Sequence, residues 1–376
     1  MSRRPYALVA GGGTGGHLVP ALAVARALGR GRGEGSVELV GSRRGLDAEL
    51  LAEAGLPVRL LPGRGFVRRL SPGAAASNVI AVAELAVAVI LAFVLVGRRR
   101  PAVVVAMGGY ASVAGSVAAV LWRVPVVLVN VDAVPGAANR LIGRFARAAA
   151  VAFPGTALPR AVVTGAPVRP EIADAAHPDA ASRLEARRAL GLPEGGQVIG
   201  AVGGSLGAAR INEALLELAR LWADRTDVAL YHVVGRRDYQ WVAAAGSGAA
   251  GAALRYVQVA YEERMALFYR ASDVVVCRAG ANTVAELAVV GVPAVLVPLP
   301  GAPGDHQSAN ARALAQAGAA VILADDACTG ARLADVLEDM LGDPGRLEAM
   351  ATAGAALGRP DAVEAVAAVV EAEARK

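Results

Sequence analysis

Cysteine and aromatic residues are scarce in this chain, and each shortage excludes a class of protein. Only two cysteines occur among 376 residues, Cys277 and Cys328, and their separation forms neither a metal-binding spacing nor a disulfide framework. We therefore expect a reducing, cytoplasmic environment. Aromatic side chains make up 4% of the sequence and do not interleave with its basic residues. The sequence therefore has no recognisable nucleic-acid-binding signature, and no nucleic-acid partner is expected.

The first residues also lack the pattern of a secretory signal. Arg3 and Arg4 are followed by Pro5 and a short apolar run, and glycines then stand where a signal peptide has its apolar core. The chain is instead 55% hydrophobic, with 44 glycines and 20 prolines. This composition is typical of an α/β protein with many tight turns, and the length predicts two or three domains.

Negative charge is scarce in the first half of the chain and abundant in the second. Residues 1–169 carry 20 arginines and seven acidic side chains, a net charge of +13. Residues 170–376 carry 18 basic and 26 acidic side chains, a net charge of −8. A basic half can face nucleic acid or an anionic membrane, and the missing nucleic-acid signature favours the membrane.

A glycine-rich run follows the first predicted strand. It reads GGGTGGH over residues 11–17, and residues 18–28 then have helical spacing. The glycines match the G-x-G-x-x-G pattern of dinucleotide-binding proteins, but Glu38 lies inside the second strand and not at its end, where the acidic partner belongs. The turn equally suits close approach of a phosphate or another substrate. His17 at its exit is a candidate general base, although an isolated histidine is more often structural.

The longest apolar run spans residues 79–96, with Glu84 as its one charged residue. Its length reaches the threshold for a membrane span. Pro101 and a new strand follow soon after, which favours a buried or half-buried helix within a βα repeat. A third interpretation places part of this helix on a bilayer surface. The flanking basic residues are Arg64, Arg68, Arg69, Arg98, Arg99 and Arg100.

The second half repeats the order strand, glycine turn, helix, most clearly in residues 273–298. An apolar strand precedes a turn at Gly280, and a helix opens near Asn282. A helix start presents free N–H groups and the positive end of its dipole, which favours a bound phosphate. Glu286, one turn further along, could accept hydrogen bonds from hydroxyls such as those of a ribose. The alternative is an ordinary βα unit of a Rossmann-like domain.

The charge changes sign near a break in this pattern, around residues 165–172, where we expect a linker. The predicted domains are residues 1–165, onto which a helix at about 358–376 packs back, and residues 166–357. Tandem α/β domains of this kind predict an active site in a cleft between the carboxyl ends of both sheets.

Four motifs occur in a fixed order along the chain. They are GGGTGGH at 11–17, MGGYAS at 107–112, GGSLGA at 203–208, and RAGANTVAE at 278–286 followed by DHQSAN at 305–310. In this order and spacing, the chain resembles the MurG family of glycosyltransferases from about residue 6 to about residue 323. The resemblance implies an α/β GT-B fold, in which two Rossmann-like domains face each other across a cleft.

The same resemblance implies an inverting hexosyltransferase that moves N-acetylglucosamine (GlcNAc) from UDP-GlcNAc to lipid I, undecaprenyl-diphosphate-MurNAc-pentapeptide. The product is lipid II, for peptidoglycan synthesis. The implied partners are UDP-GlcNAc, the lipid-linked acceptor, an anionic membrane surface at the cytoplasmic face, and other cell-wall synthesis proteins. No cofactor is implied. No required metal is expected, because no Asp-x-Asp motif stands where a donor-binding metal would lie.

The resemblance also assigns site residues. The first glycine turn would line the acceptor side and approach the donor, while Arg169 and Ser205 would bind the donor and its phosphate. The helix start would hold the diphosphate and, through Glu286, the ribose. Gln307 would form hydrogen bonds with sugar hydroxyls, and the backbone near Glu262 would contact uracil. The other assigned residues are Thr14, Gly15, Gly16, Tyr110, Asp132, Ala281, Asn282, Thr283, Val284 and Ala285.

The chain departs from the family pattern near the expected sugar and acceptor. VNVD at residues 129–132 stands where the family has HEQN, so Asp132 replaces an asparagine, and Ala166 replaces the asparagine of a GNPVR motif. The nucleotide-side motifs are intact. The alternatives are therefore a transferase for another UDP-sugar or another lipid or natural-product acceptor, and a non-catalytic relative that binds UDP-sugar or a membrane.

The predicted reaction is a displacement with inversion. A hydroxyl of the acceptor attacks the anomeric carbon, UDP leaves, and His17 takes the hydroxyl proton, a contribution of about 10²–10⁴-fold. N–H groups at the helix start and the Ser205 turn would stabilise the leaving diphosphate. A competing hypothesis is an NAD-dependent enzyme that uses the first glycine turn; the second such turn and the position of Glu38 disfavour it.

Overall fold

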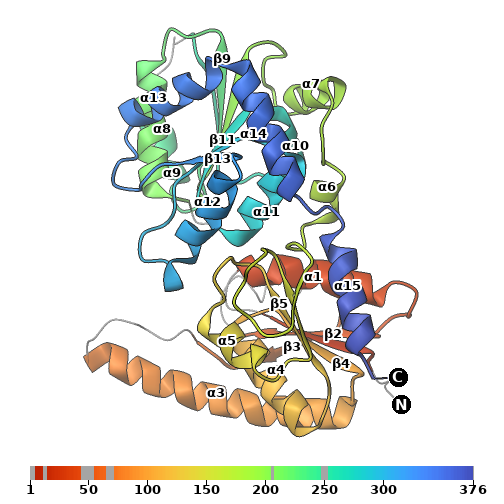
Figure 1. Cartoon of the computed structure of the whole chain (residues 1–376). Coiled ribbons are helices and arrows are strands. Elements are labelled where there is room, and N and C mark those ends of the chain that lie inside the picture. The colour runs from red at the N-terminus through yellow and green to blue at the C-terminus, as the bar shows by residue number, and fades with distance from the viewer. Residues whose placement is uncertain are drawn as a thin grey trace. The chain divides into compact units, whose positions relative to one another are not determined.

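The computed structural model describes residues 5–11, 15–43, 55–64, 72–204, 207–246 and 253–375. The chain forms two compact units (Figure 1). Unit 1 comprises Met1–Arg169 together with Asp361–Lys376, and unit 2 comprises Pro170–Pro360. The sequence predicts divisions at residues 165 and 357, and the units divide at Arg169 and Pro360.

Unit 1 is built on a seven-stranded parallel sheet in the order β3-β2-β1-β4-β5-β6-β7. Strand β1 lies between β2 and β4, so the chain order reverses beside it. In open parallel sheets, ligands bind at the carboxyl ends of the strands at such a point. The central strands are buried runs of alanine and valine, as a sheet covered on both faces requires. The strands are β1 Ala7–Ala10, β2 Val37–Ser42, β3 Val58–Leu61, β4 Val103–Ala106, β5 Val126–Asn130, β6 Ala148–Val151 and β7 Ala161–Val163.

The helices of unit 1 include one that is far away in sequence. Helix α15 packs against α1, and the ion pairs Arg30–Glu364 (3.0 Å) and Arg32–Glu371 (2.7 Å) join this region (Figure 1). The backbone N–H of Arg375 donates to the carbonyl of Ala102, just before β4, at 3.0 Å. Unit 1 is therefore completed by chain that follows unit 2. The helices are α1 Gly15–Gly29, α3 Pro72–Arg99, α4 Gly109–Leu121, α5 Ala137–Gly143 and α15 Ala362–Glu373.

Helix α3 contains the long apolar run and lies on the outside of unit 1 (Figure 1). Its small side chains face inward: Ala88, Ala92 and Val96 join the core of the unit. Its large side chains face outward. The segment Ala76–Arg99 is long and apolar enough to cross a membrane, and 22% of its most apolar window is buried. The exposed large side chains, here called the α3 face, are Val79, Ile80, Val82, Val87, Ile90, Leu91, Phe93 and Val94.

Two ion pairs join α3 to the rest of unit 1. Glu84 pairs with Arg64, which follows β3, at 2.7 Å, and Arg99 pairs with Glu38 of β2 at 2.8 Å. The Glu38 side chain is 5% exposed. Its burial and its arginine partner explain why Glu38 cannot serve as the ribose acceptor of a dinucleotide-binding site. The Glu38–Arg99 pair is largely buried, and removing one partner of a buried pair costs about 3–5 kcal/mol, so this contact holds the end of the helix to its unit.

Unit 2 has a six-stranded parallel sheet in the order β10-β9-β8-β11-β12-β13, with a reversal beside β8. Helix α11 begins at Ala281 directly after β11 and a short turn, as the sequence predicts. The strands are β8 Gln197–Val202, β9 Val228–Val233, β10 Arg255–Val259, β11 Val274–Cys277, β12 Ala294–Leu296 and β13 Ala320–Ile322. The helices are α6 Pro170–Ala173, α7 Ala180–Ala189, α8 Ala209–Leu221, α9 Tyr239–Gly246, α10 Met265–Ala271, α11 Ala281–Val290, η2 Pro303–Asp305, α12 His306–Gln316, α13 Gly330–Leu341 and α14 Pro344–Leu357.

Most predicted strands are present within a residue or two of their expected bounds. The apolar run at 161–164 predicts a strand, and this strand is β7, whose residues are all exposed at the edge of the sheet. The sequence also predicts a helix at 46–56 and a basic loop at 63–69; the helix lies mostly, and Arg68 and Arg69 lie wholly, outside the described residues.

Candidate functional site

In unit 1, two glycine turns meet at the carboxyl ends of β1 and β4. A β-carbon at Gly11 would lie 2.9 Å from the Cβ of Met107, so only glycine fits between these strands. Gly108 has a φ of +103°, and a β-carbon there would lie 2.6 Å from Cδ2 and 2.7 Å from Nε2 of His17. The imidazole of His17 thus rests on the bare backbone of the second glycine turn, which explains the glycine at 108.

A chain of amide side chains reaches the same place. Asn139 of α5 donates to the side-chain oxygen of Asn130 at 2.9 Å, and Asn130 donates to the carbonyl of Asp132 at 2.6 Å. The Oδ1 of Asn139 lies 3.5 Å from where a Gly108 β-carbon would be. This oxygen is buried and has no hydrogen-bond partner within the described part of the chain. A buried acceptor of this kind is normally satisfied, which identifies Asn139 as a residue that a ligand hydroxyl or a water would meet.

Tyr110 connects the second glycine turn to the ends of the neighbouring strands. A β-carbon at Gly63 would lie 3.4 Å from the Cβ of Tyr110, and the hydroxyl of Ser42 donates to the Gly63 carbonyl at 3.3 Å. Arg64 follows at once and pairs with Glu84. His17, Tyr110 and Arg64 therefore all lie near the carboxyl edge of this sheet, where Arg64 is held by Glu84.

In unit 2, the start of α11 has the backbone geometry that favours an anion. Gly280 caps the helix without a side-chain hydrogen bond, and the first bond of the helix runs from the N–H of Val284 to the Gly280 carbonyl at 3.0 Å. The N–H groups of Ala281, Asn282 and Thr283 precede that bond, so they point out of the helix end. The Oδ1 of Asn282 is buried and lacks a hydrogen-bond partner in the ranges described. These groups can hold a phosphate and a neighbouring hydroxyl.

Glu286 lies one turn into α11, as the sequence predicts, but it faces inward. Its carboxylate accepts a hydrogen bond from the Tyr269 hydroxyl at 2.8 Å, and the residue is 7% exposed. The neighbouring thiol of Cys277 is fully buried, and burial raises its pKa, which Glu286 raises further. The sequence did not indicate that Tyr269 fixes the Glu286 carboxylate, because the two residues belong to different helices.

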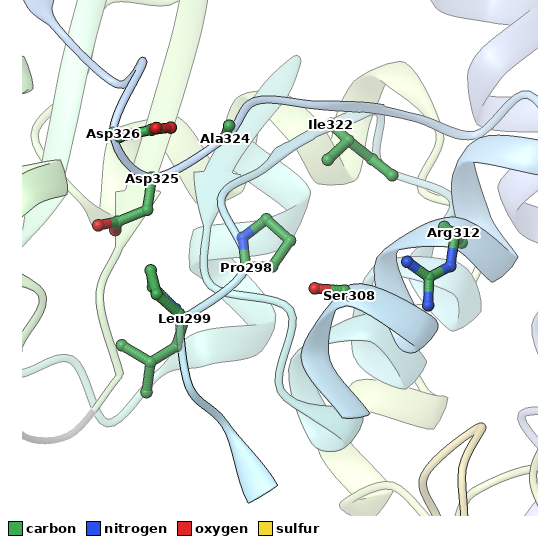
Figure 2. Close-up of a pocket in the computed structure, with 9 residues that line it drawn as sticks. Pro298, Leu299, Ser308, Arg312, Ile322, Ala324, Asp325 and Asp326 are labelled. Carbon is green, nitrogen blue, oxygen red and sulfur yellow. The ribbon is translucent and has the colours of Figure 1, made fainter. Parts of the chain in front are cut away.

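Gln307 closes the loop after β12. Its side-chain oxygen accepts from the backbone N–H of Leu299 at 2.9 Å, so its NH₂ group is the part that can meet a sugar hydroxyl. A cavity of about 500 Å³ lies beside this loop, with Ser308 and Arg312 on one side and Asp325 and Asp326 on the other (Figure 2). The remaining lining residues are Pro298, Leu299, Pro300, Ile322 and Ala324.

The carboxylate of Glu262 is used mainly in hydrogen bonds within unit 2. Its carboxylate accepts from the Tyr231 hydroxyl at 2.5 Å and from the backbone N–H of Arg264 at 2.8 Å. Burial acts to raise the pKa of Glu262, but the hydrogen bonds from Arg264 and Tyr231 outweigh it and hold that pKa below its usual value. The neighbouring Tyr261 is 44% exposed, and the guanidinium of Arg236 lies over its ring at 4.4 Å.

The other predicted site residues are only partly described. Thr14 and Ser205 lie outside the described residues, whereas Gly15 and Gly16 open α1. Arg169 is half-buried at the boundary of unit 1, and Asp132 is half-buried beside Asn130. Sequence reasoning missed Asn139, because residues 130–139 read as a loop; an asparagine on the buried side of a short helix is the signal that could have identified it.

Comparison with known proteins connects these features. Residues 7–151 match the model of the glycosyltransferase family 28 N-terminal domain, and residues 198–366 match that of the family 28 C-terminal domain. The UDP-N-acetylglucosamine–N-acetylmuramyl-(pentapeptide) pyrophosphoryl-undecaprenol N-acetylglucosamine transferase of Desulforudis audaxviator is 37% identical over 98% of each chain. The protein of the same name from Alkalilimnicola ehrlichii is 41% identical over 98% of this chain and 99% of its own.

Solved structures agree with this assignment. MurG of Acinetobacter baumannii matches with a TM-score of 0.76 and 30% identity, over 97% of this chain and 98% of its own. The glycosyltransferase of kitacinnamycin matches with a TM-score of 0.71 at 18% identity, which supports the fold alone. The predicted GT-B fold is confirmed, and the chain belongs to the MurG family within glycosyltransferase family 28.

Proposed function

We propose that this protein transfers GlcNAc from UDP-GlcNAc to lipid I and forms lipid II, as an inverting N-acetylglucosaminyltransferase of peptidoglycan synthesis. The observation that carries this function is the likeness to N-acetylglucosamine transferases along almost the whole chain, at 37% and 41% identity. A likeness of this extent covers both units and every glycine turn described above.

The donor would bind to unit 2. The diphosphate would lie on the N–H groups at the start of α11 and on the Ser205 turn, where the helix dipole favours negative charge. Ribose hydroxyls would meet Glu286, which Tyr269 holds in place at 2.8 Å. Gln307 would offer its NH₂ group to the sugar, and the backbone beside Glu262 would contact the uracil. Arg169 would also contact the donor.

The acceptor would bind to unit 1, where His17 is the general base. The acceptor hydroxyl oxygen forms a bond to the anomeric carbon while the bond from that carbon to the UDP oxygen breaks. His17 takes the hydroxyl proton, and the leaving diphosphate keeps the electron pair. Gly108 helps to position the imidazole ring of His17, because the ring packs directly against the Gly108 backbone. Thr14, Gly15, Gly16, Tyr110 and Asp132 would line this site.

The α3 face would dock on an anionic bilayer at the cytoplasmic side. At its end, Trp122 stacks on Phe93 with 5.0 Å between ring centroids, and the guanidinium of Arg100 lies 4.2 Å from the Trp122 ring. Aromatic and basic side chains of this kind are enriched at the membrane interface. We propose surface docking and not a span, because a span would separate the ion pairs of Glu84 and Arg99 from their partners.

A transferase for another sugar or acceptor is the second candidate. Asp132 stands where the family has an asparagine, and a carboxylate accepts hydrogen bonds but cannot donate them as an amide does. This difference would change which sugar hydroxyls or acceptor groups are bound, without affecting the nucleotide.

Turnover with defined substrates tests the proposal. The full chain is incubated with UDP-GlcNAc and a short-chain lipid I analogue, and lipid II and UDP are measured. Formation of both products supports the proposed function. Stabilisation by UDP without turnover on lipid I, but with turnover on another UDP-sugar or acceptor, supports the second candidate. Stabilisation by NAD and not by UDP would contradict both.

A further inference from the structure

A continuous row of buried polar side chains lies behind the glycine turn at residues 203–208 of unit 2. The Tyr256 hydroxyl on β10 lies 2.8 Å from Nδ1 of His232 on β9. Nε2 of His232 lies 2.9 Å from the side-chain oxygen of Asn212 on α8. The Nδ2 of Asn212 donates to the carboxylate of Asp238 at 3.1 Å. His232 and Asn212 are both fully buried.

The direction of every hydrogen bond in this row is determined. Nδ2 of Asn212 faces two acceptors, the Val234 carbonyl and the Asp238 carboxylate, so its Oδ1 is the atom that faces His232. Nε2 of His232 must therefore donate, and its Nδ1 must accept from the Tyr256 hydroxyl. Burial lowers the pKa of His232 to about 3, so the ring is neutral at physiological pH and keeps this tautomer.

The far end of the row contacts the glycine turn itself. Gly207 has a φ of +86°, and a β-carbon there would lie 2.6 Å from the Val234 carbonyl and 2.8 Å from the Asp238 carboxylate. The N–H of Gly207 donates to the Gly204 carbonyl at 2.9 Å and closes the turn. Arg237 pairs with Asp238 at 2.8 Å, which balances the negative charge behind the turn.

We infer that His232 is a positioning residue for the donor substrate: through Asn212 and Asp238 it holds Gly207, at the described end of the glycine turn, in its left-handed conformation, and so supports the turn that would receive a phosphate of the nucleotide sugar. The inference rests on the proposed function, in which this turn binds the donor diphosphate. His232 itself touches no substrate. A neutral ring with a fixed tautomer fits this role, because its polar contacts persist throughout the working pH range.

Steady-state kinetics on the full-length protein test the inference. His232→Phe keeps the ring volume approximately but removes both ring nitrogens, so Asn212 and Tyr256 lose their partner. We expect the KM for UDP-GlcNAc to rise about tenfold, while kcat and the KM for the lipid acceptor stay within about twofold. His232→Gln keeps an N–H for Asn212 and should restore most of the donor affinity. Tyr256→Phe removes only the outermost hydroxyl and should raise the donor KM by about twofold.

If His232→Phe does not fold, a second variant, Asn212→Asp, tests the same inference. Asn212→Asp has the same shape but places a carboxylate against that of Asp238, and like charges this close raise the pKa of the pair. The charged or titratable groups facing the pair are Arg237 and the neutral His232. We expect a donor KM about tenfold above wild type at pH 8 that approaches the wild-type value at pH 6, where a shared proton restores a donor.

Two results would overturn the inference. One is an unchanged donor KM in both variants; the other is an equal loss of donor affinity, acceptor affinity and kcat, which indicates general damage to the fold. The wild-type protein separates this inference from the proposed function. If wild type neither gains thermal stability from UDP nor turns over UDP-GlcNAc, the proposed function fails, whereas failure of the variants alone refutes only the role of His232.

Discussion

Units 1 and 2 share a parallel sheet with a reversal beside its first strand, yet they differ in where their polar groups are left open. In unit 2 the side chains of Tyr256, His232, Asn212 and Asp238 are joined by hydrogen bonds in a row that ends against Gly207. In unit 1 the corresponding edge holds Asn139, whose oxygen is buried and unsatisfied within the described ranges. Unit 2 has a buried oxygen of the same kind in Asn282, at the start of α11, so the two units differ in the satisfied row behind the glycine turn of unit 2 and not in the absence of open acceptors.

The outer surfaces differ as well. In unit 1 the large exposed apolar side chains gather on α3, whereas in unit 2 they are scattered, as at Leu221, Trp241 and Leu357. The chain is also basic through residue 169 and acidic after it. Scattered apolar residues are normal for a protein surface, but a continuous apolar face beside arginines marks a membrane contact. These differences fit the proposal above, in which unit 1 meets the bilayer and unit 2 binds the nucleotide.

The largest expected effect comes from removing the base in unit 1. His17→Ala should lower kcat about 10²–10⁴-fold, because the acceptor hydroxyl loses its proposed base, while UDP binding to unit 2 stays unchanged. Turnover on lipid I and the thermal shift caused by UDP measure the two effects separately. His177→Ala, at an exposed histidine of unit 2, is the matched control and should leave kcat unchanged. A loss of less than about tenfold for His17→Ala would remove its role as the base.

Gly108→Ala should produce the next largest effect. The added β-carbon would lie 2.6 Å from the His17 ring, and the φ of +103° is strained for any residue but glycine. We expect kcat to fall about tenfold or more and stability to fall by about 1–3 kcal/mol. Gly31→Ala is the control, because its φ is +72° but open space surrounds it. It should lower the Tm without changing kcat; an equal kcat loss in both variants would contradict the role of Gly108.

Charges on the α3 face should weaken membrane binding without affecting the donor site. Ile90→Glu, at a side chain that is 63% exposed, should lower binding to anionic vesicles about tenfold or more, because an apolar contact of about 1.5–3 kcal/mol is lost. Leu221→Glu, at a 60% exposed leucine of unit 2, is the control and should bind vesicles like wild type. Vesicle sedimentation measures both. Equal binding by Ile90→Glu and wild type would place the membrane contact elsewhere.

The smallest effect concerns the stability of unit 2. The pKa of folded Glu262 is lowered, so its contribution is present above the pKa of the unfolded chain, about 4.3, and is lost as pH falls. Glu262→Gln should reduce the free energy of unfolding by about 1–3 kcal/mol at pH 7, and the difference should shrink below about pH 4. Urea unfolding at several pH values measures this. Glu194→Gln, in an exposed pair with Arg188, should change little at any pH; a pH-independent difference for Glu262→Gln would contradict the assignment.

The sequence alone predicts a large part of this architecture. Apolar runs followed by glycines identify the strand ends, and the start of α11 follows from Gly280 and the helical spacing after it. The orientation of α3 does not follow, since the same composition suits a core helix and a surface helix; only the burial of Ala88 and Ala92 and the exposure of Ile90 decide it.

Long-range polar partners are the other part that the sequence does not reveal. Tyr269 with Glu286, and His232 with Asn212, are 17 and 20 residues apart. Nothing in local spacing connects them, because the contacts form only when separate elements pack. The same holds for Asn139, whose significance depends on its position beside Gly108 and His17.

The return of α15 to unit 1 has a consequence for biosynthesis. As the chain leaves the ribosome, all of Pro170–Pro360 emerges before α15 and before Arg375, which bonds to Ala102. Unit 2 can therefore fold while unit 1 still lacks helix α15. Unit 1, which carries the α3 face, therefore reaches its finished fold only after all of unit 2 has been made.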